Sequence, residues 1–149
     1  MSPHTSQLWG RFLKYFLIAV ALACVVGLWC FFQAARTAID AEYTLHAYYA
    51  ILELVEQHVS ETGQWPSDWK SLEKIPYRHE SMWKWPEDST EIQRRITIDF
   101  ELSLDQVAAM TPEDFPAIRQ RQPCFPMTGR VEILLEAIRG RLGEAKSEP

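Results

Sequence analysis

An uncharged and strongly apolar run near the amino terminus constrains this chain more than any other feature. It covers the eighteen residues from Tyr15 to Phe32, ten of which are large aliphatic or phenylalanine side chains. As a helix the run is about 27 Å long, close to the ~30 Å hydrocarbon core of a bilayer. The ten apolar side chains favour insertion by about 3 to 6 kcal/mol. We therefore predict a transmembrane helix at 15–32, preceded by a cytoplasmic tail at 1–14.

A cleaved signal peptide has the same order of basic and apolar residues, because Arg11 and Lys14 precede the run. This run is longer than the usual signal core, and the bulky Trp29 and Phe32 stand where a cleavage site needs small residues. Lipidation at Cys24 is disfavoured because the apolar run continues beyond it. We therefore expect a retained single-pass anchor in the lipid bilayer.

Charge predicts which side of the membrane each part occupies. Arg11 and Lys14 precede the span, whereas Arg36 on the other side is balanced by Asp40 and Glu42. The more positive flank stays in the cytoplasm, so the rest of the chain is expected to be extracytoplasmic. All 20 acidic residues and 13 of the 15 basic ones follow the span, giving this part a formal charge of −7. That balance does not favour nucleic acid as a partner.

The three cysteines predict no disulfide within one chain. Cys24 and Cys30 lie six residues apart in the apolar run and do not share a helix face, so they cannot bridge each other. We expect Cys124 to be a small buried apolar residue, with a disulfide to another chain or a reactive thiol as the alternatives.

The membrane helix is predicted to continue well beyond the apolar run. No glycine or proline interrupts the chain from Leu28 to Thr62, and Gly63 supplies a helix stop. One helix of about fifty residues follows from this pattern. Small and apolar residues mark one face of it at alternating intervals of four and three, namely Ala34, Ala38, Ala41, Leu45, Tyr48, Leu52, Val55 and Val59.

A β-sheet is the predicted cover for that face. The segment Ile96–Leu104 alternates apolar and polar residues over nine positions, with Phe100 on the apolar side and Asp99 and Glu101 on the polar side. A single strand is not stable alone, and Met82–Trp85 is the predicted antiparallel neighbour.

Two helix signals follow the predicted strand. Thr111 and Pro112 are suited to the start of a short helix. A C-terminal helix is indicated by apolar residues at helical spacing, and the segment 143–149 is expected to be disordered. The fold class is therefore α+β, with one extracytoplasmic domain at 33–142. The apolar residues of the C-terminal helix are Val131, Leu134, Leu135, Ile138 and Leu142.

The end of the long helix and the loop after it resemble type IV pilins and type II secretion pseudopilins. The resemblance rests on the order of Gly63, Trp65, Pro66, Ser67 and Leu72. In this loop Gly63 ends the helix, Pro66 forces an extended entry, and Ser67 is expected to cap a short turn that buries Leu72. The resemblance implies a pilin-like fold, in which the long helix packs on a small antiparallel sheet.

The pilin processing signal is not matched. Gly10 is followed by Arg11 where pilins have phenylalanine, and the fifth residue after Gly10 is Tyr15 where pilins have glutamate. We therefore expect a stationary membrane protein that prepilin peptidase does not trim.

A cluster of four tryptophans is the one candidate interaction site. Trp65, Trp69, Trp83 and Trp85 fall within twenty-one residues. They can fill the domain core, form a protein interface or stack on sugar rings, and core packing is the favoured interpretation. Exposure of Trp83 and Trp85 separates these alternatives.

The sequence shows no pattern typical of an enzyme, a metal site or a cofactor site. The histidines and cysteines lack metal-binding spacing, and no glycine-rich phosphate loop is present. We expect a non-enzymatic protein with a structural or protein-interaction role in secretion or cell-envelope assembly. A membrane-anchored module for a cell-wall glycan or another envelope ligand is the alternative. A homo-oligomer through a coiled coil of the long helices is left open.

Overall fold

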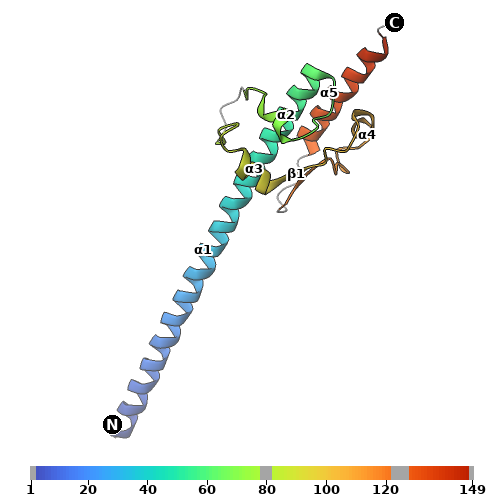
Figure 1. The fold of residues 1–149 in the computed structure, drawn as a ribbon. Helices are drawn as coiled ribbons and strands as arrows, with labels where there is room; N and C mark the ends of the chain where they lie inside the picture. The colour runs from blue at the N-terminus through green and yellow to red at the C-terminus, as the bar shows by residue number, and fades with distance from the viewer. Residues whose placement is uncertain (1–2, 78–81, 122–127, 148–149) are drawn as a thin grey trace. The chain divides into compact units, whose positions relative to one another are not determined.

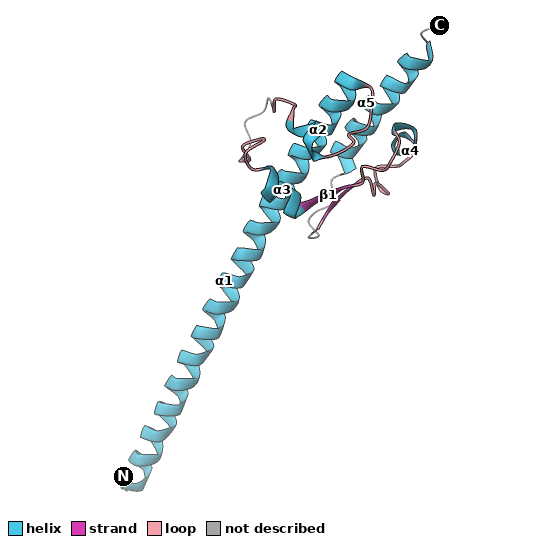
Figure 2. Ribbon diagram, in the orientation of Figure 1, coloured by secondary structure: helices cyan, strands magenta, loops and turns pink. Residues whose placement is uncertain are grey.

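The computed structural model describes residues 3–77, 82–121 and 128–147, and Cys124 lies outside them. The chain divides into two compact units, Met1–Asp40 and Ala41–Pro149. The described elements are mainly helices with a small antiparallel sheet, which agrees with the predicted α+β class (Figures 1 and 2). They are α1 (Pro3–Thr62), α2 (Trp69–Glu73), α3 (Ser89–Arg95), β1 (Ile96–Ile98), α4 (Leu104–Ala108), β2 (Ile118–Gln120) and α5 (Thr128–Ser147).

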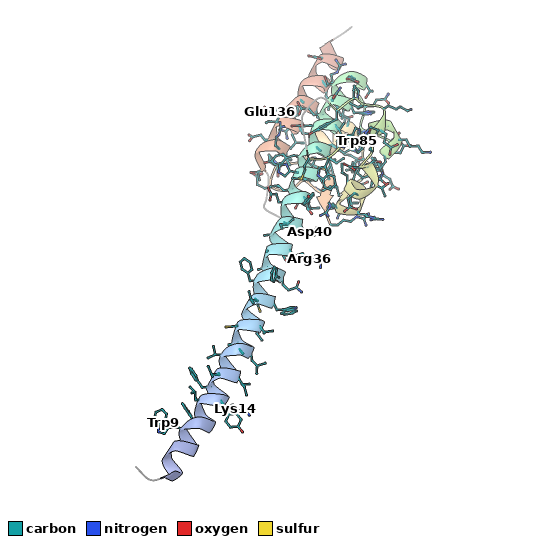
Figure 3. The ribbon with its side chains drawn as sticks, turned by 90° about the vertical axis from the view of Figure 1, so that its left-hand side faces the viewer. Trp9, Lys14, Arg36, Asp40, Trp85 and Glu136 are labelled. Carbon is teal, nitrogen blue, oxygen red and sulfur yellow. The ribbon has the colours of Figure 1, made fainter. Side chains whose placement is uncertain are left out.

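The first unit is the amino-terminal part of α1. Its side chains from Phe12 to Ala34 are all exposed and project around the helix (Figure 3). Lys14 and Arg36, both labelled in the figure, are the charged residues that bracket the uncharged run. Among the described residues, α1 is the one helix long and apolar enough to cross a membrane. These properties are compatible with the predicted anchor.

The second part of α1 forms the centre of the domain core. Tyr48, Leu52, Val55 and Val59 are buried as predicted, and Leu45 is half-buried. The buried face is wider than the predicted stripe, because α1 is covered from two sides. The hydroxyl of Tyr48 donates to the Ile118 carbonyl of β2 at 3.5 Å, and α5 lies beside α1 in both views (Figures 1 and 3). The additional buried residues of α1 are Thr44, Ala47, Ala50, Ile51 and Leu54.

The predicted end of α1 is confirmed. The helix ends at Thr62, and Gly63 adopts a φ of 67° that side chains with a Cβ rarely tolerate. The Gly63 N–H donates to the Val59 carbonyl at 2.8 Å, which satisfies one of the last helical acceptors.

The loop after Gly63 leads into α2, but Ser67 is not its cap. Asp68 is the N-cap residue, and its carboxylate accepts the N–H of Ser71 at 2.7 Å. Aspartate and serine are both favoured at this position, so the sequence pattern placed the cap one residue too early. Leu72 is fully buried and Pro66 is buried, as the pattern required.

The predicted nine-residue strand is wrong beyond Ile98. β1 has three residues and pairs with β2 in antiparallel register, with Thr97 opposite Arg119. The Asp99 carboxylate accepts the N–H of Glu101 at 3.1 Å, which turns the chain out of the extended conformation. Ser103 then caps α4 through a reciprocal capping box with Gln106.

Met82–Trp85 is not the neighbouring strand. This segment is closed on itself by local hydrogen bonds, because the Lys84 N–H donates to the Asp88 carboxylate at 2.7 Å and the Asp88 N–H donates to the Lys84 carbonyl at 2.7 Å. α3 begins directly afterwards at Ser89. The sheet partner comes instead from β2, more than thirty residues further along the chain.

The helix predicted at Thr111 is replaced by a turn. The Asp114 N–H donates to both the hydroxyl and the carbonyl oxygen of Thr111, each at 3.2 Å. Thr111 therefore closes a turn and is not the N-cap of a helix. Pro116 follows too soon for helical turns to accumulate, and the chain enters β2 at Ile118.

The predicted C-terminal helix is present as α5. Val131, Leu134, Leu135 and Ile138 are buried and Leu142 is half-buried. The helix continues to Ser147, past the point at which we expected order to end. α5 packs on α4, as Arg139 shows by donating to the Ala108 carbonyl at 3.0 Å and to the Met110 carbonyl at 2.8 Å.

Candidate interaction surface

The four tryptophans contact different parts of the domain. Trp65 is buried, and its ring N–H donates to the Asp99 carbonyl at 2.8 Å. Trp69 is half-buried and meets the ring of Phe100 edge-on at 5.7 Å between centroids. Both contacts support the turn that ends β1.

The other two tryptophans stabilise the 82–88 segment. Trp83 is only 8% exposed, so its ring has no open face for a ligand. Trp85 is half-buried, and its ring N–H donates to the Leu72 carbonyl of α2 at 3.2 Å. Burial of Trp65 and Trp83 favours core packing over sugar stacking for these two rings.

A cluster around Arg95 joins three segments that are distant in sequence. The Arg95 guanidinium lies 5.7 Å from the ring centroid of Tyr43 and 5.8 Å from that of Trp83. The two rings meet edge-on at 5.6 Å. This arrangement combines two cation–π contacts with an aromatic pair, and we refer to these three residues as the Arg95 cluster.

Polar contacts fix the Arg95 side chain in the cluster. One terminal nitrogen donates to the buried hydroxyl of Thr44 at 3.1 Å, and the other lies 3.1 Å from the Glu91 carboxylate. Glu91 and Arg95 both belong to α3 and Thr44 belongs to α1, so the hydrogen bond from Arg95 to Thr44 joins the two helices. No local sequence pattern indicates this cluster, because Tyr43 and Arg95 are separated by 51 other residues.

Few large apolar side chains of the described domain are exposed. In the described part of 41–149, large exposed hydrophobic side chains are Tyr43 at 41%, Met82 at 44% and Ile133 at 43%. Tyr43 is a member of the cluster, and Met82 directly precedes Trp83. Ile133 belongs to α5. Tyr43 is therefore the exposed aromatic side chain of the Arg95 cluster.

A second polar group ties α1 to α5. The carboxylate of Glu53 accepts the hydroxyl of Tyr77 at 3.0 Å and pairs with Arg130 of α5. The Arg130 guanidinium also lies 6.0 Å from the ring centroid of Tyr49. The Glu53 carboxylate therefore has two partners within the fold, Tyr77 and Arg130, and these contacts give it a structural role.

The described titratable side chains form no metal cluster. No group of three or more histidine, cysteine or acidic residues in the described ranges is placed to hold a metal ion. Asp99 and Glu101, which share a face in an ideal strand, instead form the turn that ends β1. Burial lowers the pKa of His58, and the neighbouring Glu61 carboxylate partly opposes this effect.

Comparison of this chain with protein-family models, with curated proteins and with solved structures finds no match in any of the three.

Proposed function

We propose that this chain is a single-pass membrane protein whose domain acts through protein contacts in a secretion or envelope assembly. Two properties of α1 support the proposal. Its uncharged amino-terminal run is fully exposed, whereas its carboxy-terminal part is the centre of a small folded domain. One helix thus supplies both an apolar anchor and the central helix of the domain. This combination is the observation on which the proposal rests.

The resemblance to pilins and pseudopilins adds a second line of support. The long helix ends at Gly63, the loop carries Trp65 and Pro66 into the core, and Leu72 is buried beneath it. A pilin-like arrangement requires a long helix of this kind packed on an antiparallel sheet. Within the described residues the sheet has two strands, so we propose a reduced version of that fold.

The proposed orientation places the amino terminus in the cytoplasm and the domain outside it, because basic residues flank the span mainly on the amino-terminal side. An impermeant thiol reagent on intact cells tests this in a variant with all three cysteines replaced by alanine. A cysteine added after Pro149 is expected to react without lysis, whereas Ser2→Cys is expected to react only after lysis. The reverse pattern contradicts the orientation.

Glycan binding through the tryptophan cluster is the alternative function and has less support. Trp65 and Trp83 are buried, while Trp69 and Trp85 are half-buried and engaged in contacts within the domain. A sugar-stacking site needs open aromatic faces, and these rings are largely used by the fold itself.

The proposed role is tested by the size of the particle that the protein forms in its own membranes. Membranes of the source cells are solubilised in mild detergent and separated on a native gel. We expect the full chain to migrate within a larger assembly. A variant that lacks residues 33–149 keeps the span and is expected to migrate alone. Migration of both chains as single copies contradicts the proposal.

A further inference from the structure

The outer face of the β1–β2 sheet carries two arginines side by side. Arg119 and Arg121 are two positions apart in an extended segment, so their side chains leave the same face about 6 to 7 Å apart along the strand. Arg121 continues the pairing, because its N–H donates to the Arg95 carbonyl at 2.7 Å. Both arginine side chains are exposed, whereas Ile98 and Ile118 on the opposite face are buried in the core.

These two guanidinium groups differ from the others in the domain. In the part of the domain that the structure describes, neither side chain takes part in a hydrogen bond, an ion pair or a cation–π contact. Two unpaired like charges side by side favour an anionic partner. The other described arginines of the domain each have at least one such contact, and they are Arg94, Arg95, Arg130, Arg139 and Arg141.

The exposed side of α5 carries a pair of acids. Glu132 and Glu136 are one helical turn apart, which places their Cβ atoms about 5 to 6 Å from each other on one face. Both are exposed, as Figure 3 shows for Glu136, and Ile133 beside them is 43% exposed. Arg139, the base three positions after Glu136, donates instead to the carbonyls of Ala108 and Met110.

The arginine pair and the glutamate pair are complementary in charge and similar in spacing. A separation of about 6 to 7 Å faces one of about 5 to 6 Å, so each guanidinium can meet one carboxylate. Ile133 can then pack on the aliphatic stems of the arginines and on Thr97, which lies opposite Arg119 in the sheet. No ion pair joins the two pairs within one copy over the described ranges, so both are available to a second copy.

We propose that the sheet face bearing Arg119 and Arg121 docks on the face of α5 bearing Glu132 and Glu136 in a second copy of this chain. Both surfaces belong to the unit Ala41–Pro149, so the contact requires neither the membrane anchor nor another protein and goes beyond the function proposed above. Exposed ion pairs are individually weak, and complementary charges set the choice of partner more than the affinity. The contact is therefore weak and sensitive to salt.

Energy transfer between full-length copies tests the contact. The three native cysteines are replaced by alanine, and a cysteine added after Pro149 carries a donor or an acceptor dye. The copies are mixed in non-ionic detergent with micelles in large excess, so that two chains seldom share a micelle by chance. We expect transfer that rises with protein concentration. It is expected to be lost as the ionic strength is raised from about 0.01 to about 1 M, because the Debye length falls from about 30 to about 3 Å.

Reciprocal charge reversal identifies the two surfaces. Arg119→Glu with Arg121→Glu, and separately Glu132→Arg with Glu136→Arg, are each expected to weaken association by about a hundredfold, because like charges then face each other. A mixture of the two reversed chains is expected to restore transfer. One chain that carries all four changes is also expected to restore it, at the natural net charge.

Lys70→Glu with Lys74→Glu is the matched control. It changes the net charge as much as the arginine reversal does, at two exposed positions outside the contact, and is expected to leave transfer unchanged. Undiminished transfer in either reversed chain, or no recovery in the chain with four changes, overturns the proposal. A natural chain without transfer also overturns it, and so does loss of transfer in the arginine reversal alone, which assigns the arginines to other acids.

Circular dichroism checks that each variant unfolds at the temperature of the natural chain. Where a reversed chain does not fold, Arg119→Gln with Arg121→Gln removes the positive charges without introducing repulsion. This variant is expected to weaken association by about tenfold. Unchanged association of the glutamine variant overturns the proposal.

Discussion

Leu52 is the residue at which packing of α1 is most directly tested. It is buried on the face of α1 that forms the domain core. Leu52→Ala is expected to reduce the free energy of unfolding by about 2 to 5 kcal/mol, through lost apolar burial and the cavity left behind. Thermal unfolding of a fragment that starts at Arg36 measures the change. Ser60→Ala, at an exposed position of the same helix, is the control and is expected to change stability little.

His58 is expected to make the stability of the domain depend on pH. Burial lowers its pKa in the folded state, so the unfolded chain binds the proton more readily. The contribution of His58 is therefore fully present above its unfolded pKa of about 6.5 and is lost as the pH falls below that value. Denaturant unfolding at a series of pH values tests this. His58→Gln is expected to flatten the curve in that range, and parallel curves for the two proteins contradict the prediction.

Single polar residues explain why the sequence predicted the strand incorrectly. The alternation from Ile96 to Leu104 is faultless, but Asp99 and Ser103 hydrogen-bond to the backbone of residues two and three positions ahead. Both residue types offer the backbone a local alternative to a sheet ladder. Alternation of apolar and polar residues indicates which face of an extended segment is apolar. It does not indicate whether a second strand is available to pair with that segment.

At the scale of elements, we predict opposite effects on stability for alanine substitutions of two glycines, one that ends α1 and one within α5. Gly63 has a φ of 67°, and a Cβ there meets no other atom within 4 Å. Gly63→Ala is therefore expected to cost about 1 to 2 kcal/mol from backbone strain alone. Gly140 lies in α5 with equally open space around it, so Gly140→Ala is expected to stabilise by about 0.5 to 1 kcal/mol. Chemical denaturation measures both, and changes of equal sign contradict the argument.

A second prediction at this scale concerns how much the residues of β1 and of the turn after it contribute to stability. Ile98 of β1 is buried, whereas Phe100 beyond the strand is half-buried and contacts Trp69. Ile98→Ala is expected to cost about 2 to 5 kcal/mol, and Phe100→Ala less than a fully buried phenylalanine would. Glu101→Ala, at an exposed position, is the control. If Phe100→Ala proves more costly than Ile98→Ala, the apolar face extends further than the short strand indicates.

Long elements were predictable from sequence and short ones were not. α1 and α5 have many apolar residues at helical spacing, and Gly63 gives α1 an unambiguous end. α3 has seven residues and β2 has three, too few for periodicity to indicate an element. Their conformations depend on contacts with distant segments, as the pairing of β1 with β2 illustrates.

At the scale of the whole molecule, the sequence located the candidate residues but not their surroundings. The tryptophan cluster was evident from composition, and its preference for the core follows from the size of the rings. The Arg95 cluster was not predictable, because Tyr43, Trp83 and Arg95 come from three separate segments. Only the fold brings them together.

The state of the amino terminus decides whether the whole molecule can enter a filament as pilins do. Pilin assembly requires removal of the leader before the apolar run, and Arg11 and Tyr15 depart from the processing signal around Gly10. We therefore expect an untrimmed chain when the protein is purified from membranes of its source cells, with only loss of the initiator methionine allowed. Intact-mass spectrometry measures this directly.

A matched variant separates absence of the signal from absence of the peptidase. Arg11→Phe combined with Tyr15→Glu restores the two pilin positions while leaving the uncharged run from Phe16 onward unchanged. If a prepilin peptidase is present in the same cells, this variant is expected to be trimmed after Gly10 while the natural chain remains intact. A natural chain that begins at Arg11 contradicts the prediction and makes filament incorporation the better account of the long exposed helix.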